Sequence, residues 1–386
     1  WGDQMHGSAY LDELDRILVT ALQTSPRASW QQVGRVLDVS ASTAARRWDR
    51  LAEAGLAWFS GHPTRPPNSS FIRALIEIDC ATTRLLPIGT TLAADPHVLT
   101  VNHVTGSHDL LVTAVFSDQI SLGRYIRFRI GRLAGVRSVH PHLVTALHTE
   151  GSRWRLDRLT AAHRVALLTD TRPAPPARSP DTHADTHGPD AVDMALIAAL
   201  STNPRRPAAE LARDIQVSTT SVRRRLARLD AARLMACRCE VARHVSGWPT
   251  AVNFWGAVPP EHAPRISGRI AQLRETRLCA SLSGPDNLMF SAWFRSLHDL
   301  QPFEAFLAKQ LPELAVTARN LVLWHMKLGT NTLDPEGRRI DEVPFSLWSP
   351  GEAVAAENTV LEPGSAQDAR AVGVAAGDAR GIESFE

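Results

Sequence analysis

The chain has 386 residues, of which 44% are hydrophobic and 21% charged, and its formal net charge is +2 at pH 7. These values are typical of globular protein, and the length leaves room for more than one domain with its own core. No apolar run approaches the roughly 20 residues of a membrane-spanning helix and no signal-peptide pattern opens the chain, so the sequence predicts a cytoplasmic protein.

Residues 11–60 are predicted to form a small helical domain. An apolar stripe at helical spacing indicates a first helix, which Ser-Pro at positions 25 and 26 ends. Ser29 and Ser40 stand where N-caps would open a second and a third helix. The second and third helices are separated only by the short turn at residues 38 and 39. Two helices joined by such a turn are typical of a helix-turn-helix.

The third helix has a buried stripe and an opposite polar surface. Ala44, Trp48 and Leu51 follow helical spacing on one side. A recognition helix meets base edges with its N-terminal half, where short hydroxyls approach phosphate and arginine forks onto guanine. The side chains predicted to contact DNA in this copy are Ser42, Thr43, Arg46, Arg47 and Arg50.

Residues 70–150 change their hydrophobic period and are predicted to form a second domain. Alternating or apolar runs indicate strands, and the segments between them favour helices. The predicted order is β-α-β-β-α-β. The expected strands cover residues 71–80, 98–104, 110–116 and 136–147, with helices at 82–94 and 119–133.

A linker rich in Pro, Asp, Thr and His is predicted at residues 169–189, and the whole module then repeats. Residues 192–234 align with 14–56 without a gap and share about 16 identities over about 43 positions. The repeat predicts a second helix-turn-helix domain at 190–240 and a second β-α-β-β-α-β domain at 248–330. Its expected DNA contacts are Thr220, Ser221, Arg224, Arg225 and Arg228.

Apolar and disordered segments are expected in the last third of the chain. Trp255, Trp293 and Trp324 fall in predicted strands, so we expect them in the core or at an interface between sheets. Residues 344–348 are apolar enough to dock on the rest of the protein. Residues 349–386 combine alanine, glycine and acidic residues, and they are predicted to be a disordered acidic tail.

The helical motifs resemble those of one family of regulators. The first copy has Leu-Asp near its start, Ser-x-x-Thr-x-x-Arg-Arg at 40–47 and Leu-x-x-x-Gly at 51–55. With the second domain that follows, this pattern resembles the Lrp/AsnC family of bacterial and archaeal transcription regulators, and the resemblance covers most of the chain. It implies an α+β fold: two winged-helix-like helix-turn-helix domains, each followed by a ferredoxin-like sensing and dimerisation domain.

The resemblance also implies double-stranded DNA and an amino-acid effector as partners. Family effector sites cluster around a Gly-x-x-Asp turn between the two middle strands. The matching residues are Gly106, Ser107, His108 and Asp109 in the first copy, and Gly284 and Asn287 in the second. Asn287 replaces the carboxylate, which puts effector binding by the second copy in doubt. With two modules in one chain, we expect an intramolecular pseudo-dimer, with a homo-oligomer as a further option, and an asymmetric DNA site.

Two alternative functions remain open from the residues. Sirohaem decarboxylases resemble this family, and a tetrapyrrole enzyme would draw on histidines in or beside the strands: His103, His108, His140, His142 and His325. A non-DNA-binding effector sensor is the other alternative. The four cysteines lack the four-ligand pattern of a zinc site, so no metal, cofactor or catalytic residue is expected.

Overall fold

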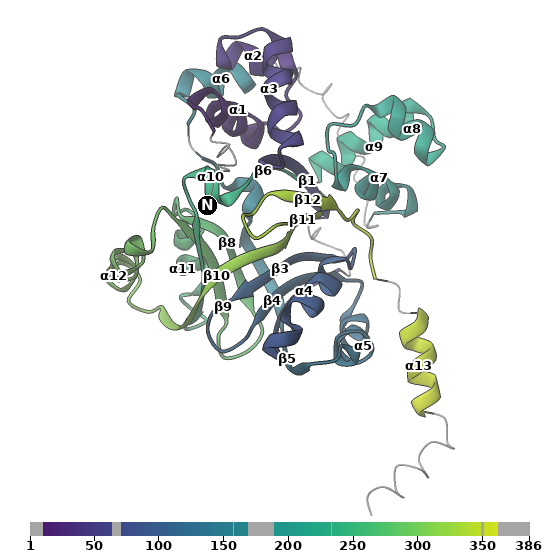
Figure 1. Ribbon diagram of the computed structural model, residues 1–386, viewed down its shortest axis with the longest axis vertical. Helices are drawn as coiled ribbons and strands as arrows, with labels where there is room; N and C mark the ends of the chain where they lie inside the picture. The colour runs from purple at the N-terminus through teal and green to yellow at the C-terminus, as the bar shows by residue number, and fades with distance from the viewer. Residues whose placement is uncertain are drawn as a thin grey trace, which may run out of the picture.

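The computed structural model describes residues 11–63, 71–156, 158–168, 189–232, 234–348 and 351–361. The predicted α+β class with two copies of each domain is confirmed (Figure 1). Apart from residue 189, the predicted linker at 169–189 lies outside the described residues. Within the described ranges, no helix is long and apolar enough to cross a membrane.

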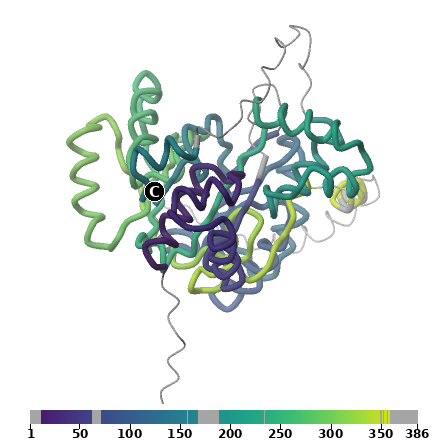
Figure 2. The backbone as a smooth tube through the Cα atoms, turned by 90° about the horizontal axis from the view of Figure 1, so that it is seen from above, coloured from purple at the N-terminus to yellow at the C-terminus, as the bar shows by residue number. Residues whose placement is uncertain are grey.

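Each helical domain has the three predicted helices. The first consists of α1 (Glu13–Thr24), α2 (Trp30–Leu37) and α3 (Ala41–Glu53), against which α6 (Ala161–Leu168) also packs. The second consists of α7 (Ala191–Ser201), α8 (Ala208–Ile215) and α9 (Thr219–Ala231). Figures 1 and 2 show the two helical domains beside each other on the same side of the strands.

The helix boundaries follow from local hydrogen bonds. As predicted, Ser29 and Ser40 are N-caps, and the Oγ of Ser40 accepts the Thr43 amide at 3.1 Å. In each copy the turn before the third helix needs a left-handed residue, which is Asp38 (φ 55°) in the first and Gln216 (φ 60°) in the second. This conformation costs a non-glycine residue roughly 1–2 kcal/mol, so both turns are held by the packing around them.

A two-stranded sheet joins the two helical domains, and the sequence did not predict that its strands come one from each copy. Strand β1 (Ala57–Pro63) follows α3, and β6 (Met235–Val241) follows α9. The two strands pair antiparallel, from Ala57 opposite Val241 to Pro63 opposite Met235. Each helical domain therefore supplies one strand of a shared wing, and the two domains belong to one structural unit.

Both β-α-β-β-α-β domains have the predicted order. The first comprises β2 (Ile72–Cys80), α4 (Leu85–Ala93), β3 (Val98–Val104), β4 (Leu110–Phe116), α5 (Gln119–Phe128) and β5 (Val136–Thr149). The second comprises β7 (Thr250–Ala257), α11 (Ala263–Ile270), β8 (Thr276–Leu282), β9 (Leu288–Phe294), α12 (Leu300–Gln310) and β10 (Ala315–Leu328). The short elements are η1 (Thr82–Arg84), η2 (Ile130–Arg132), η3 (Gly151–Arg153), α10 (Arg243–Ser246), η4 (Leu297–Asp299), β11 (Asn331–Leu333) and β12 (Arg339–Glu342).

The two domains are joined through their long last strands. The first half of β5 pairs with β2 of its own domain, and its second half pairs with β8 of the other. Likewise β10 pairs with β7 through its first half and with β3 through its second. The strand order β10-β3-β4-β2-β5-β8-β9-β7 thus closes on itself, with β11 and β12 as an extension. The expected intramolecular pseudo-dimer is therefore continuous in its hydrogen bonding.

The closed sheet separates an inner core from two outer cores. On the outside, each half packs against its own helices, as Ile76 does in the first half and Phe254 in the second. On the inside, Trp255 and Trp293 are 2% and 1% exposed and cluster with Leu75 of the other half. Their predicted place between the sheets is confirmed. Trp324 lies in the half of β10 that pairs with β3, so it packs on the outer core of the first half.

The C-terminal prediction is correct for its first part and wrong for its second. Residues 344–348 do dock: Phe345 is 1% exposed among the residues of the second helical domain, and its amide donates to Ser201 Oγ at 3.0 Å. The predicted disordered tail at 349–386, however, contains helix α13 (Gly351–Leu361). Alanine and glutamate favour a helix, and Glu357 bonds Arg124 on α5 at 2.6 Å. Residues 362–386 lie outside the described part.

A buried lysine leads to a prediction about pH. Lys327 is 0% exposed, and its Nζ donates to the Asp95 carbonyl at 2.8 Å. Burial lowers the pKa of Lys327 to about 7. Above that pH the unfolded chain holds a proton that the folded chain has lost, so stability rises with pH, by at most about 1.4 kcal/mol per pH unit.

The Lys327→Met variant is expected to lose this slope above about pH 7, whereas the buried thiols contribute equally to the variant and to the unmodified chain. Urea unfolding at several pH values measures the slope. Lys309→Met is the matched control, because Lys309 is exposed on α12. An identical slope in Lys327→Met and the unmodified chain would rule out this role.

Candidate nucleic-acid interface and ligand site

The predicted DNA-contacting residues lie together on α3 and α9, but they differ in exposure. Ser42, Arg46, Thr220 and Arg224 are exposed, while Thr43 and Ser221 are half-buried. The Ser40 Oγ that caps α3 also lies 2.9 Å from Ser42 Oγ and 2.8 Å from Thr43 Oγ1. The hydroxyls at the start of the helix are therefore ordered before any DNA arrives.

Four of the six predicted arginines form ion pairs within their own helical domain. In the first copy, Arg47 Nη1 lies 2.8 Å from Asp15 Oδ1 and 2.7 Å from Asp12 Oδ2. Arg50 Nη2 reaches the other oxygen of Asp15 at 2.5 Å. The hydrogen bond to Asp12 raises the pKa of Arg47 above its usual value. These contacts tie α3 to α1.

The second copy repeats the arrangement. Arg225 Nη1 lies 2.8 Å from both Asp190 Oδ2 and Asp193 Oδ1, and Arg228 pairs with Asp193. Asp193, like its counterpart in the first copy, is 0% exposed. The recurrence of a buried carboxylate beneath the same two arginines indicates a brace between the first and third helices. DNA contact by these four arginines stays a prediction.

Arg46 and Arg224 are different. Both are exposed, and neither makes a hydrogen bond or ion pair with another described residue. They occupy equivalent positions, one residue before the braced arginines Arg47 and Arg225. Of the predicted contacts, these two guanidinium groups are the ones left available to an anionic partner. The sequence held the signal for this split, because Asp15 and Asp193 are kept in both copies together with the arginines.

The predicted effector turns have a structural role in both copies. Gly106 and Gly284 have φ of 108° and 115°, a backbone that glycine adopts readily. Asp109 Oδ2 accepts the Cys80 amide at 2.8 Å, which fastens the end of β2 to the turn. Asn287 holds the end of β7 with two bonds, accepting the Val258 amide at 2.9 Å and donating to its carbonyl at 2.8 Å. The exchange of Asp for Asn thus preserves the turn.

One acidic residue next to the first turn was missed. Glu77 points to the inside of the closed sheet, with Oε1 3.5 Å from His108 Nδ1 and Oε2 3.7 Å from His142 Nε2. Burial acts to raise the pKa of Glu77, but the neighbouring histidines outweigh it and lower the pKa. The signal in the sequence was an acidic residue flanked by the apolar residues Leu75, Ile76 and Ile78. Effector binding by Gly106, Ser107, His108 and Asp109 stays a prediction, as it does for Gly284 and Asn287.

A separate cavity of about 90 Å³ lies inside the closed sheet. It is lined from both halves, by Arg73, Leu75, Asn102 and Thr113 of the first and by Asn253, Arg277, Met289, Trp293 and His325 of the second, and also by Arg238 of the wing. Its volume suits a small molecule or a few waters. The described part of the chain contains no group of three or more His, Cys, Asp or Glu residues placed to hold a metal ion.

Models of known domain families match three parts of the chain. The AsnC-type helix-turn-helix domain matches residues 11–52 and again 190–230. The Lrp/AsnC ligand binding domain matches residues 73–153. The matches therefore fall on both helical domains and on the first ferredoxin-like domain.

Relatives of single-module length carry regulator names. An uncharacterised helix-turn-helix-type transcriptional regulator of Pyrococcus horikoshii is 28% identical over 142 residues, 36% of this chain and 90% of the relative. The transcriptional regulator Ptr1 of Methanocaldococcus jannaschii is 25% identical over 144 residues, 37% of this chain and 97% of the relative. Among solved structures, the siroheme decarboxylase NirDL with an iron-uroporphyrin III analogue covers 90% of this chain and 99% of its own, with a TM-score of 0.54 and 14% identity. This structural similarity is evidence for the two-module fold and for nothing further.

Proposed function

The chain belongs to the Lrp/AsnC family of DNA-binding transcription regulators, and from that premise we propose that its two helix-turn-helix domains read one asymmetric DNA site under the control of a small molecule. The observation that carries the proposal is the pair Arg46 and Arg224. Each is an exposed guanidinium that is unpaired among the described residues, and the arginine that follows it on the same helix, Arg47 or Arg225, is ion-paired with a buried aspartate. Such a group can fork onto a guanine edge or bind phosphate in the major groove.

The expected asymmetry follows from residues that differ between equivalent positions of α3 and α9. Position 45 is alanine where α9 has Arg223, and position 49 is aspartate where α9 has alanine. The second helix therefore presents more positive charge than the first. Because the shared wing of β1 and β6 joins both domains in one chain, the two unlike helices approach DNA together. Unlike half-sites are the consequence.

Selection of bound fragments from genomic DNA by the full chain, at fixed salt, tests this function. We expect a recovered site with unlike halves and an affinity that falls steeply as salt rises, because lysine- and arginine-bearing proteins release counterions from phosphate. Absent or salt-insensitive binding would contradict DNA reading and favour the effector sensor that acts through protein contacts. A perfectly palindromic footprint from one chain would contradict the asymmetry alone.

The small molecule is proposed to be an amino acid or a similar metabolite bound by the ferredoxin-like domains. Repeating the fragment selection with and without amino acids tests this part. Association of several chains through the same domains is a further proposal, which the mass of the protein in solution tests. We propose a cytoplasmic location for this regulator, since it would act there on chromosomal DNA.

We propose regulation rather than tetrapyrrole chemistry. Ordinary ligand pockets have about 300–1,000 Å³, and a tetrapyrrole is large even for that range. The cavity inside the closed sheet has about 90 Å³. His325, which lines it, has its Nδ1 2.6 Å from Asn102 Oδ1 and is held by that bond. Titration with a tetrapyrrole, followed by visible absorption, tests the alternative, and a saturable spectral change would restore it.

A further inference from the structure

The cavity inside the closed sheet has an unbalanced charge. Among the described residues that line it, Arg73, Arg238 and Arg277 are basic and none is acidic. Glu150 and Glu240, the carboxylates that pair with Arg238 and Arg277, supply two negative charges against these three positive ones. Both are almost fully buried, at 8% and 2% exposed. Among these described groups, the arginines therefore carry one more positive charge than the two carboxylates balance.

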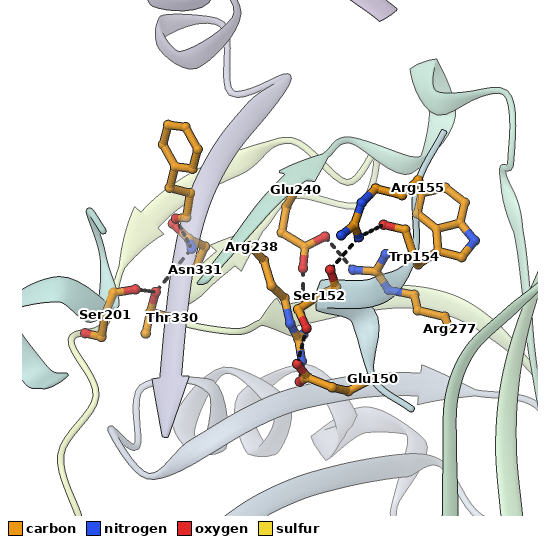
Figure 3. A network of polar contacts seen from close by, with 11 residues as sticks. Glu150, Ser152, Trp154, Arg155, Ser201, Arg238, Glu240, Arg277, Thr330 and Asn331 are labelled. Carbon is orange, nitrogen blue, oxygen red and sulfur yellow. Dashed lines mark hydrogen bonds and ion pairs between the residues drawn. The ribbon is translucent and has the colours of Figure 1, made fainter. Parts of the chain in front are cut away.

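The two carboxylates are already committed to two of the arginines. Figure 3 shows Arg238 between Glu150 and Glu240, with Arg277 beside Glu240. The second contact of Arg238, from Nη1 to Glu240 Oε1, is 3.7 Å. Arg277 also lies over the Trp293 ring, with Cζ 4.2 Å from the ring centroid. This network fixes where Arg238 and Arg277 point.

Arg73 carries the remaining charge. It is half-buried on β2 and makes no hydrogen bond or ion pair with another described residue. Burial lowers the pKa of Arg73, and Arg238 adds to this, against an opposing effect of Glu150. An arginine stays protonated in proteins, so its charge must be met by solvent or by a ligand.

Two further polar groups on the cavity wall lack partners. Asn253 is 2% exposed, and its Nδ2 has no hydrogen-bond partner among the described residues. His325 is 8% exposed, and its Nε2 is unpartnered as well. Asn102 Oδ1 can only accept, so the Nδ1 of His325 donates to it and Nε2 is left as an acceptor. Buried polar groups without partners are uncommon and call for an explanation.

We propose that this cavity binds a small anion that also carries a hydrogen-bond donor. Its carboxylate or phosphate oxygens meet Arg73 and the Asn253 amide, and its hydroxyl or amino hydrogen meets His325 Nε2. The cavity is distinct from the turn at residues 106–109 where an effector is predicted. A ligand of a few heavy atoms fills its volume of about 90 Å³.

We extend the proposal to coupling: binding of the anion in the cavity changes the position of the recognition helices. This step rests on the proposed function. Arg238 and Glu240 lie on β6, where they pair with Ser60 and Trp58 of β1. Phe59, which lies between these two residues of β1, packs against Trp48 of α3 with its ring tilted by 36° and the ring centroids 4.3 Å apart. An anion in the cavity competes with Glu150 and Glu240 for the arginines, which shifts β6 and, through the wing, α3.

The binding step is tested on the full chain without DNA. Inorganic phosphate and glycolate are the probes, glycolamide is the uncharged control, and sodium chloride holds the ionic strength constant. Tryptophan fluorescence follows binding, because Trp293 lies against Arg277. We expect saturable binding of at least one anion and none of glycolamide. Binding of phosphate or of glycolate identifies the anion type, whereas no saturable change with either overturns the proposal.

Two variants make the test specific. Arg73→Gln is expected to weaken anion binding at least about tenfold, since it removes the unpaired charge. Asn253→Asp places a carboxylate in the cavity, so it is expected to abolish anion binding and to raise the melting temperature. Arg319→Gln, at an exposed arginine, is the matched control and should bind as the unmodified chain does. Undiminished affinity in Arg73→Gln, or in Asn253→Asp if the first variant does not fold, overturns the site.

The coupling to DNA has its own readout. A saturating anion is expected to change the affinity for the selected DNA site, and this change should disappear in Asn253→Asp. Anion binding without any effect on DNA affinity overturns the coupling and leaves the ligand site standing. Anion binding by a chain that does not bind DNA contradicts the proposed function instead.

Discussion

Replacing Arg46 and Arg224 together by alanine is expected to weaken specific DNA binding by about 1–3 kcal/mol for each guanidinium that forks onto a base. Both side chains are exposed and unpaired among the described residues, so their removal leaves no buried carboxylate behind. The melting temperature should therefore stay unchanged. Gel-shift titration on the selected site, at fixed salt, measures the loss.

The single variants measure the contributions of α3 and α9 to DNA binding separately. If the site is asymmetric, Arg46→Ala and Arg224→Ala should relax base preference in different halves of it. Arg319→Ala removes the same charge from β10, outside the helical domains, and should leave the affinity unchanged. Equal affinity of the double variant and the unmodified chain would refute base reading by these arginines.

Replacing Asp15 by asparagine is expected to destabilise the first helical domain by about 2 kcal/mol. The carboxylate is 0% exposed and bonds Arg47 and Arg50 at 2.8 and 2.5 Å. Removing one partner of a buried ion pair costs about 3–5 kcal/mol, and the value is smaller here because the arginines are 25% and 57% exposed. Hydrogen exchange of α1 and α3, read by mass spectrometry, measures the local opening.

The second copy supplies an internal comparison. Asp193→Asn should loosen α7 and α9 in the same way and leave α1 and α3 as they were. Asp49→Asn, at an exposed position of α3, is the control for loss of a negative charge. If Asp15→Asn and Asp49→Asn exchange alike, the brace makes no contribution to stability.

Most of the fold followed from local pattern. Period, caps and turn residues predicted the strands of both ferredoxin-like domains to within a few residues, because alternating or apolar runs bounded by turn residues mark each strand. The pairing of the two wing strands with each other was not predicted, and the reason is physical. Strand β1 pairs with β6, which lies almost 180 residues further along the chain, and the residues of β1 do not indicate which strand it pairs with.

The residues of the candidate DNA-binding surface were predicted, but the sequence did not separate the arginines that form ion pairs from those that are free to contact DNA. The repeat identified which residues the helices need, yet the same recurrence suited a brace and a DNA contact equally. Only the buried position of Asp15 and Asp193 separates Arg47 from Arg46. The cavity could not be predicted from the sequence, because Arg73 and Asn253 lie in different halves and only tertiary packing brings them to the same cavity wall.

Closure of the sheet through β5 and β10 has a consequence for how the two modules change over time. Strands pair across three boundaries between the modules, β5 with β8, β10 with β3 and β1 with β6, through backbone hydrogen bonds that any residue except proline can make. The residues that recognise DNA or a ligand can therefore change independently in the two halves, while the strand pairing between the halves is kept. One of the two recognition helices, α3 or α9, can change its DNA sequence preference while the other keeps the original preference, and both halves stay paired.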